Sequence, residues 1–438
     1  MKKLLIFLLV PVFIAMAGCQ KEFSNPNAAD GGQLVNSAEG LTALIVGLKR
    51  EYSFGATGTL YNVVSANGLT TKELYVINTG NGELTALENG KGTVGASNSF
   101  LRNIWTSANL LKANAQILID NADALRAPGT SEPIRVYGHL FKAIALGTMA
   151  QFWEQVTAQV VTTDDFLNGK RPAFISRTQA LEEAVSLLNA AAPLAEVAPS
   201  GFFTLKVGSD LNLKNTVYAL LARYNLMLGK YNEALAAAAK VDLTNANTVR
   251  SFWRYDNITQ NPLYRISFVT NNVHNGLPNF GLTGALAPDA ADGRIAFYLG
   301  SNTAPVKVQG FFKSDNDQIP VYLPGEMTLI IAEAQARLGN LTEAVKALDA
   351  VRTKATDPFN VTAKLPAYSG AQDKDAILAE IYRQRCIELY LSGMKLEDSR
   401  RFGRPGPNDP NAERSRNFYP YPQVERDNNI NTPADPAI

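Results

Sequence analysis

Residues 319–352 read IPVYLPGEMTLIIAEAQARLGNLTEAVKALDAVR, and the apolar pattern of this stretch decides the fold of the chain. Two apolar stripes at helical spacing flank a Leu-Gly-Asn break at residues 338–340. Gly339 and Asn340 suit the left-handed residue that ends a helix. The stretch therefore predicts an antiparallel helical hairpin of tetratricopeptide type. Its two stripes are Met327, Ile330, Ile331, Ala334 and Leu338, then Leu341, Ala344, Val345, Leu348 and Val351.

A second copy of this hairpin lies earlier in the chain. Residues 211–241 read LNLKNTVYALLARYNLMLGKYNEALAAAAKV, and Leu228-Gly229 aligns with Leu338-Gly339. Such hairpins cannot bury their apolar faces alone, so several of them must stack. Two interpretations stay open: the stack presents a surface that binds another protein, or it is a helical core without a binding role.

Length and composition place the chain among globular proteins. Its 438 residues suffice for two or three domains, with 46% hydrophobic and 18% charged residues. The net charge of +1 gives no electrostatic reason to expect binding of nucleic acid.

The N-terminus predicts export and lipidation. Lys2 and Lys3 precede an apolar run, residues 4–17, that is too short to span a bilayer. The run ends in Ala17-Gly18-Cys19, which resembles a bacterial lipobox. We expect residues 1–18 to be a lipoprotein signal peptide, Cys19 to carry the lipid and residues 19–32 to form a tether; the alternative is a chance cysteine near an ordinary cleavage site. The second cysteine, Cys386, then has no disulfide partner and is expected to be a small buried hydrophobe.

The remaining pattern is helical with two irregular interruptions. We predict a mainly α fold with little β-structure, in which residues 33–438 form one domain of tetratricopeptide-like hairpins near residues 102–153, 177–241, 320–352 and 374–403. Residues 55–100 and 245–318 are rich in Asn, Gly and aromatic residues and predict irregular insertions, the first of them a long surface loop. Residues 90–95 (GKGTVG) match a dinucleotide-binding motif by letter but lack a buried strand before them, so we assign no nucleotide there.

Several motifs along the chain occur together. Trp105 stands before Ala113-Asn114, Glu326-Met327 opens the hairpin helix, residues 384–403 carry an Arg/Glu-rich run, and residues 419–425 read YPYPQVE. In this order, and behind a lipobox, they resemble the SusD/RagB-like outer-membrane lipoproteins of Bacteroidota, which serve nutrient uptake. The chain departs from that pattern at Glu154, Gln384, Ser392, Lys395 and Ser399, and we expect the departures in the last helix to weaken a charge network there.

The resemblance implies a function as well as a fold. A SusD-like protein is lipid-anchored in the outer membrane, faces the cell surface, and captures a nutrient, most often a glycan. It hands this ligand to a SusC-like TonB-dependent transporter. The alternatives are capture of a peptide or another nutrient, and a pure protein-interaction scaffold without ligand binding.

Catalytic residues are scarce, so we predict no enzyme and no cofactor. The chain has two histidines, His139 and His274, which poorly supply a Ser-His-Asp triad or a zinc site. Two carboxylates could still form a glycosidase pair, which a sequence alone leaves open. Residues 315–317 (Asp-Asn-Asp) could belong to a calcium loop, but the glycine of an EF-hand is missing.

Sugar binding needs flat aromatic faces together with amides and carboxylates. Both irregular segments supply these groups, and the absence of a Lys/Arg cluster in them favours a neutral oligosaccharide. The candidate ligand-binding residues are Tyr75, Asn78, Asn81, Glu83, Trp253, Tyr298 and Phe311.

Overall fold

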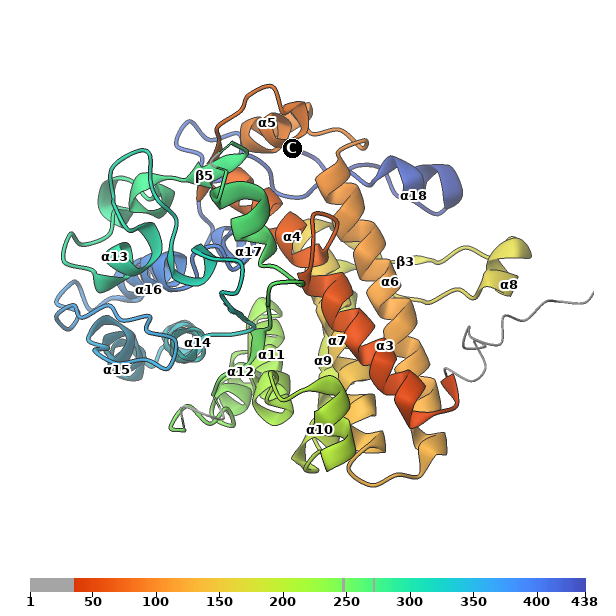
Figure 1. Ribbon diagram of the computed structural model, residues 1–438. Helices are drawn as coiled ribbons and strands as arrows, with labels where there is room; N and C mark the ends of the chain where they lie inside the picture. Colours follow the sequence, from red (N-terminus) through yellow and green to blue (C-terminus); the bar gives the residue numbers. More distant parts are fainter. Residues whose placement is uncertain (1–34, 246–248, 271) are drawn as a thin grey trace, which may run out of the picture.

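The computed structural model describes residues 35–245, 249–270 and 272–438, and its fold is mainly α-helical, as predicted (Figure 1). The predicted signal peptide, Cys19 and the predicted tether lie outside the described residues. Within the described part, the strands pair only into three two-stranded sheets. The same part contains no helix long and apolar enough to cross a membrane.

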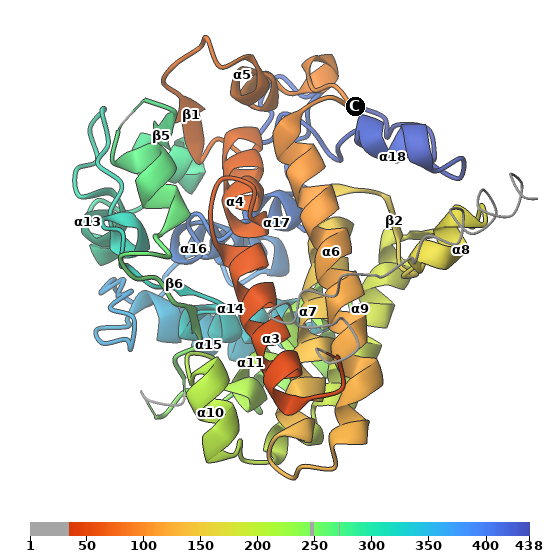
Figure 2. The same ribbon diagram turned by 45° about the vertical axis from the view of Figure 1, so that its right-hand side comes forward.

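Four helices form the first part of the body: α3 (Ala38–Ser53), α4 (Thr59–Thr70), α6 (Ser99–Asn121) and α7 (Ser131–Phe152). Helices α6 and α7 pack against each other, and α3 and α4 both pack against α6 (Figure 2). All twelve residues of α4 are buried. The prediction of a surface loop was therefore wrong for this part of residues 55–100, because the small and polar residues of α4 fill narrow spaces between larger helices.

The helical hairpins continue the body towards the C-terminus. Helix α9 (Arg177–Ala191) packs against α7 and α11 (Leu213–Met227), which pairs with α12 (Tyr231–Ala238). Helix α12 packs in turn against α14 (Pro324–Leu338), the partner of α15 (Leu341–Arg352) and α16 (Lys374–Glu388). Three short helices complete this part: α10 (Gly201–Val207), α17 (Lys395–Arg401) and α18 (Gln423–Asn428).

The two predicted hairpin copies end their first helices in the same way. Gly339 follows α14 with φ +89°, and Gly229 follows the end of α11 with φ +72°. After α14 the Asn340 N–H donates to the Gln335 carbonyl at 2.9 Å, and after α11 the Lys230 N–H donates to the Asn225 carbonyl at 2.9 Å. Both hydrogen bonds close the helix end around a left-handed residue, which glycine adopts without steric cost.

A buried charge network joins α14, α16 and α17. The Glu333 carboxylate accepts hydrogen bonds from Arg337 at 2.9 Å and from two nitrogens of Arg401 at 2.8 Å each. Arg385 donates to both oxygens of Asp398, at 2.8 and 3.0 Å, and Asp398 also accepts from Arg401. The expectation of a weakened network was wrong, because the carboxylates and guanidinium groups that remain pair with one another.

The irregular segments are held together by short strands. Strand β1 (Leu74–Val76) pairs antiparallel with β5 (His274–Gly276), so the two predicted insertions lie side by side. Strand β4 (Phe252–Trp253) pairs with β6 (Ile319–Pro320) directly before α14. The first insertion also contains α5 (Gly82–Asn89), and the second contains α13 (Gly293–Leu299).

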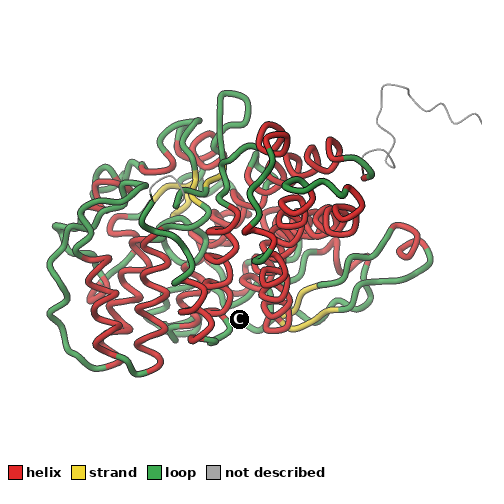
Figure 3. The backbone as a smooth tube through the Cα atoms, turned by 90° about the horizontal axis from the view of Figure 1, so that it is seen from below, coloured by secondary structure: helices red, strands yellow, loops and turns green. Residues whose placement is uncertain are grey.

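One arm projects from the body. Strand β2 (Gln155–Thr157) pairs with β3 (Phe174–Ser176), and α8 (Thr163–Leu167) lies between them. Figure 3 shows these two strands leading from the helical body to the arm at the right. Leu167, in the last turn of α8, is 77% exposed.

Candidate functional site

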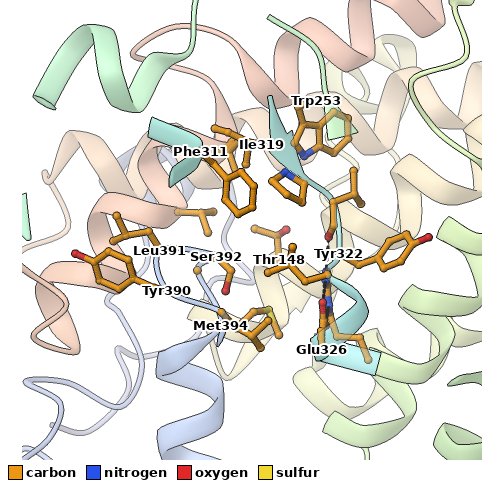
Figure 4. Close-up of a pocket in the computed structure, with 18 of the residues that line it drawn as sticks. Thr148, Trp253, Phe311, Ile319, Tyr322, Glu326, Tyr390, Leu391, Ser392 and Met394 are labelled. Atoms are coloured by element: carbon orange, nitrogen blue, oxygen red, sulfur yellow. Dashed lines mark hydrogen bonds and ion pairs between the residues drawn. The ribbon is translucent and has the colours of Figure 1, made fainter. Parts of the chain in front are cut away.

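A cavity lies where the helical hairpins meet the second irregular segment. Its volume is about 80 Å³. Figure 4 shows Phe311, Thr148, Ser392 and Met394 around the central space, and Tyr322 and Tyr390 with their hydroxyls directed away from it. The lining comes from α3, α4, α7, α11, β4, β6, α14 and the loop after α16, so residues from most of the chain build this cavity.

A buried ion pair forms part of the cavity wall. Arg223 of α11 donates from Nε to Glu326 Oε1 at 2.6 Å and from Nη2 to Glu326 Oε2 at 2.8 Å. It also donates to the Val321 carbonyl at 2.9 Å. Burial alone would lower the pKa of Arg223, but the Glu326 carboxylate outweighs it and raises that pKa above its ordinary value. The pair ties α11 to α14 next to the cavity through two charge-assisted hydrogen bonds.

The cavity also contains polar groups from α7. Gln151 donates to the Gly147 carbonyl at 3.2 Å, while its Oε1 atom is buried with no hydrogen-bond partner among the described residues. Thr148 lies one residue after Gly147 and also lines the space. A cavity of this volume and polarity has room for a few water molecules rather than a sugar ring. We therefore regard this cavity as the inner end of a larger ligand-binding site and not as the whole site.

A more open groove lies beside the cavity and shares Phe311 with it. The groove has a volume of about 320 Å³. Four half-buried phenylalanines line it: Phe252, Phe297, Phe311 and Phe359. The Phe311 ring meets Phe297 edge-on at 5.4 Å between centroids and Phe359 edge-on at 6.1 Å. These mutual contacts fix the rings, so their remaining surface is presented to the groove in a defined arrangement.

Polar side chains stand around the aromatic groove. Arg250 donates from Nε and Nη2 to the Pro358 carbonyl, at 3.1 and 2.5 Å, and thereby holds the loop that carries Phe359. Asp317 accepts from the Lys313 backbone N–H at 2.8 Å. Gln318 and Asn360 complete the polar lining. The groove thus combines aromatic surface with amide groups and charged side chains of both signs.

The structure brings three of the seven predicted ligand residues to this place. Trp253, Tyr298 and Phe311 all line the cavity. However, Trp253 is 3% exposed and Tyr298 is fully buried, with its hydroxyl donating to the Glu388 carbonyl at 2.9 Å. Neither ring has an open face for a sugar, because each packs against other aromatic rings. Only Phe311 lies in both the cavity and the groove.

The other four predicted residues lie elsewhere, around β1 and α5. Tyr75 is half-buried opposite Asn275, and Asn78 is exposed. Asn81 caps α5 by accepting from the Leu84 N–H at 3.4 Å. Glu83 accepts from the Ser99 N–H at 2.8 Å and from the Ser99 hydroxyl. None of the four lines the cavity or the groove, and Asn81 and Glu83 serve the start of a helix.

Phe359 was missed by sequence reasoning. It lies in the connection between α15 and α16, outside both segments that were predicted to carry the ligand. Its local sequence, Asp357-Pro358-Phe359-Asn360, is a turn with one aromatic residue. An isolated aromatic residue in a Pro/Asn turn is a weak signal, because nothing in the sequence shows that this turn folds back onto Phe311.

The described residues offer little for catalysis. His274 is buried, with Nε2 at 2.9 Å from Ser65 Oγ and 3.2 Å from Ser267 Oγ, and burial lowers its pKa to about 4. His139 is 8% exposed, and burial together with Arg135 lowers its pKa to about 4. No group of three His, Cys, Asp or Glu side chains in the described ranges could hold a metal ion. Near pH 7 both histidines are therefore neutral and buried, His139 in helix α7 and His274 in strand β5.

A comparison by sequence finds a match to a known family in the second half of the chain. The profile of the SusD family matches residues 246–436, which carry the groove and most of the cavity. No match was found among curated protein sequences.

Comparisons of structure extend the likeness over the chain. A SusD-like carbohydrate-binding protein of Bacteroides fragilis superposes with a TM-score of 0.64 at 14% identity, over 91% of this chain and 99% of the other. A SusD superfamily protein of Bacteroides fragilis gives a TM-score of 0.66 at 18% identity, over 90% and 98%. A laminarin-binding SusD-like protein gives 0.59 at 14% identity, over 92% and 99%. The predicted resemblance is thus confirmed: residues 246–436 match the SusD family, and nine-tenths of the chain shares the SusD-like fold.

Proposed function

We propose that this protein captures an oligosaccharide at the cell surface and passes it to a TonB-dependent transporter in the outer membrane, without cleaving it. The observation that carries this proposal is the groove formed by Phe252, Phe297, Phe311 and Phe359 on a SusD-like scaffold. In this proposal Cys19 carries the lipid that anchors the protein to the outer membrane, and the helical hairpins face the transporter.

The chemistry of the groove suits a sugar chain. The C–H faces of a pyranose ring pack on aromatic rings, and its hydroxyls bond to amides and carboxylates such as those of Gln318, Asn360 and Asp317. We expect a neutral ligand, because the Arg250 guanidinium already donates to the Pro358 carbonyl and the groove has carboxylate and ammonium side chains, Asp317 and Lys313, rather than a cluster of one sign. The groove is open and leaves much of a ligand in water, so we expect modest affinity. Modest affinity is sufficient for capture close to a transporter, because tethering the protein there raises the local concentration of the bound ligand.

Relatives of the same fold support the ligand class. One structural neighbour is described as carbohydrate-binding and another as laminarin-binding. Laminarin oligosaccharides are therefore a reasonable first probe, together with a panel of other neutral oligosaccharides.

The test is calorimetric titration of the purified protein with this panel, followed by analysis of the sugars after long incubation. We expect at least one sugar to bind. Phe359→Ala should weaken it about tenfold, which corresponds to about 1.4 kcal/mol. Phe166→Ala is the matched control, since this aromatic residue is 38% exposed on the arm and away from the groove. Binding that is unchanged in Phe359→Ala would refute the site.

Two further outcomes would refute the function itself. Absence of binding across the panel would favour a peptide ligand or a pure scaffold. Shortened sugar products, lost on substitution of a single carboxylate, would make the protein an enzyme. The transporter partner is tested separately, by purifying the lipidated protein from outer membranes and identifying a TonB-dependent barrel in stoichiometric amount.

A further inference from the structure

A second pocket, separate from the aromatic groove, is lined by basic side chains. It has a volume of about 370 Å³ and lies between the end of α4, the segment 281–286, the first residue of α17 and the loop 404–413. Its lining includes Lys72, Lys395 and Arg404, and one carboxylate, Glu413. It shares no residue with the groove or with the cavity.

Lys395 is the unusual member of this pocket. Its side chain is 5% exposed, and its Nζ donates one hydrogen bond, to the Phe280 carbonyl at 3.1 Å. No carboxylate oxygen of the described residues lies within 4 Å of this ammonium group. The buried Glu73 carboxylate interacts electrostatically with Lys395 but forms no ion pair with it within 4 Å, and two of the three Nζ hydrogens remain for another acceptor.

The other charges leave the pocket positive. Arg404 and Glu413 bind each other, with Nε at 2.9 Å from Oε1, and the second Glu413 oxygen accepts from the Tyr382 hydroxyl at 3.0 Å. Lys72 is exposed, and its Nζ donates to the Ala412 carbonyl. The carboxylate is thus neutralised, whereas Lys72 and Lys395 both stay without a carboxylate partner in the described structure.

The rest of the lining indicates the size and character of a ligand. Leu282, Leu286, Pro405 and Pro410 provide apolar surface. Thr283 and Asn411 provide exposed polar groups for hydroxyls. A simple inorganic anion would use the two ammonium groups but not this apolar surface. An acidic sugar uses both, because it carries a carboxylate on a ring with apolar faces.

We propose that this pocket binds one uronic acid unit, with its carboxylate between Lys72 and Lys395 and its ring against Leu286 and the two prolines. This site goes beyond the proposed capture of a neutral oligosaccharide and is independent of it. It would let the protein hold an acidic sugar or an acidic branch of a glycan at a second place.

The experiment is calorimetric titration of the full mature protein with D-glucuronate, with D-glucose and inorganic phosphate as separate arms. We expect glucuronate to bind at millimolar or lower concentration and to weaken as salt rises. Glucose should show no binding at the same concentrations, and phosphate should bind at least tenfold more weakly than glucuronate. Lys72→Gln should weaken glucuronate binding at least tenfold.

Lys91→Gln is the matched control, because Lys91 is also exposed and also has a positive φ, of 49° against 60° for Lys72. Lys395→Met tests whether the buried ammonium group takes part in binding glucuronate. If Lys395→Met does not fold, the Lys72→Gln variant still tests the proposal. Phe359→Ala should leave glucuronate binding unchanged, which separates this proposal from the groove. No glucuronate binding, equal binding of glucose, phosphate binding as tight as glucuronate, or an unaffected Lys72→Gln variant would each overturn the proposal.

Discussion

Replacing Glu333 by Gln tests how much the buried charge network contributes to the fold. Glu333 is fully buried, and its carboxylate bonds to Arg337 and Arg401 and lies 3.9 Å from Arg385 Nε. The amide of Gln cannot neutralise these three guanidinium groups, and its NH₂ group would face one of them. Removing one partner of a buried ion pair typically costs 3–5 kcal/mol, and we expect a loss of at least about 3 kcal/mol here.

Urea unfolding followed by circular dichroism at pH 7 measures this loss through the transition midpoint and slope. Glu343→Gln is the matched control on the neighbouring helix, because Glu343 is 57% exposed and 3.7 Å from Lys346. It should change the free energy of unfolding by less than about 0.5 kcal/mol. A loss below about 1 kcal/mol for Glu333→Gln would refute the reasoning, since it would mean that the three arginines find other partners.

The pH dependence gives a second check on the same variant. Burial by itself would raise the pKa of Glu333, but Arg401 and Arg385 outweigh it and hold this pKa below 4.5. The folded protein therefore binds this proton less readily than the unfolded chain does, so the contribution of Glu333 is complete above the ordinary pKa. It is lost as the pH falls through the lowered value. The difference between wild type and Glu333→Gln should thus shrink below about pH 4.

Three further predictions concern single sites. Gly339→Val should lower the free energy of unfolding by more than about 1 kcal/mol, because a β-branched residue is strained at a φ of +89°, although nothing lies within 4 Å of an added Cβ. Gly339→Asn should cost less, and equal urea midpoints for the two variants would contradict this prediction. Burial raises the pKa of Glu73 to about 7, so the folded protein holds a proton on Glu73 between pH 4.5 and 7 that the unfolded chain has lost, and stability falls as the pH rises through this window. Glu73→Gln should flatten this decline in the thermal midpoint, and parallel plots of midpoint against pH for the variant and the wild type would argue against the prediction. Cys19→Ser should move the protein from the membrane fraction to the soluble fraction, and recovery in membranes at wild-type level would exclude the lipid as the sole anchor.

The hairpin scaffold could be predicted from the sequence because its signals are local. Stripes of apolar residues at helical spacing, together with Leu-Gly at positions 228–229 and 338–339, specify two helices and the turn between them. The structure confirms both turns, since Gly229 and Gly339 have positive φ. The family resemblance rested on motifs of the same kind, which are short, and those around Trp105, Glu326 and Arg385 lie in helices.

The site could be predicted only in part, because burial depends on the whole fold. Trp253 and Tyr298 were expected to present aromatic faces, but the rings that pack against them come from other parts of the chain and leave both buried. Helix α4 was read as a loop for a related reason: its polar residues are buried by neighbours that are distant in sequence.

The sequence alone thus determined the helices of the hairpins and the turns between them, since each depends on residues close to one another in the chain. Only the tertiary structure decided which side chains share a surface. Phe359 contacts Phe311, from which it is separated by 48 positions in the sequence, and Lys72 lines the same pocket as Lys395, from which it is separated by 323 positions. Such contacts arise when whole helices pack, and no local pattern of residue types records them.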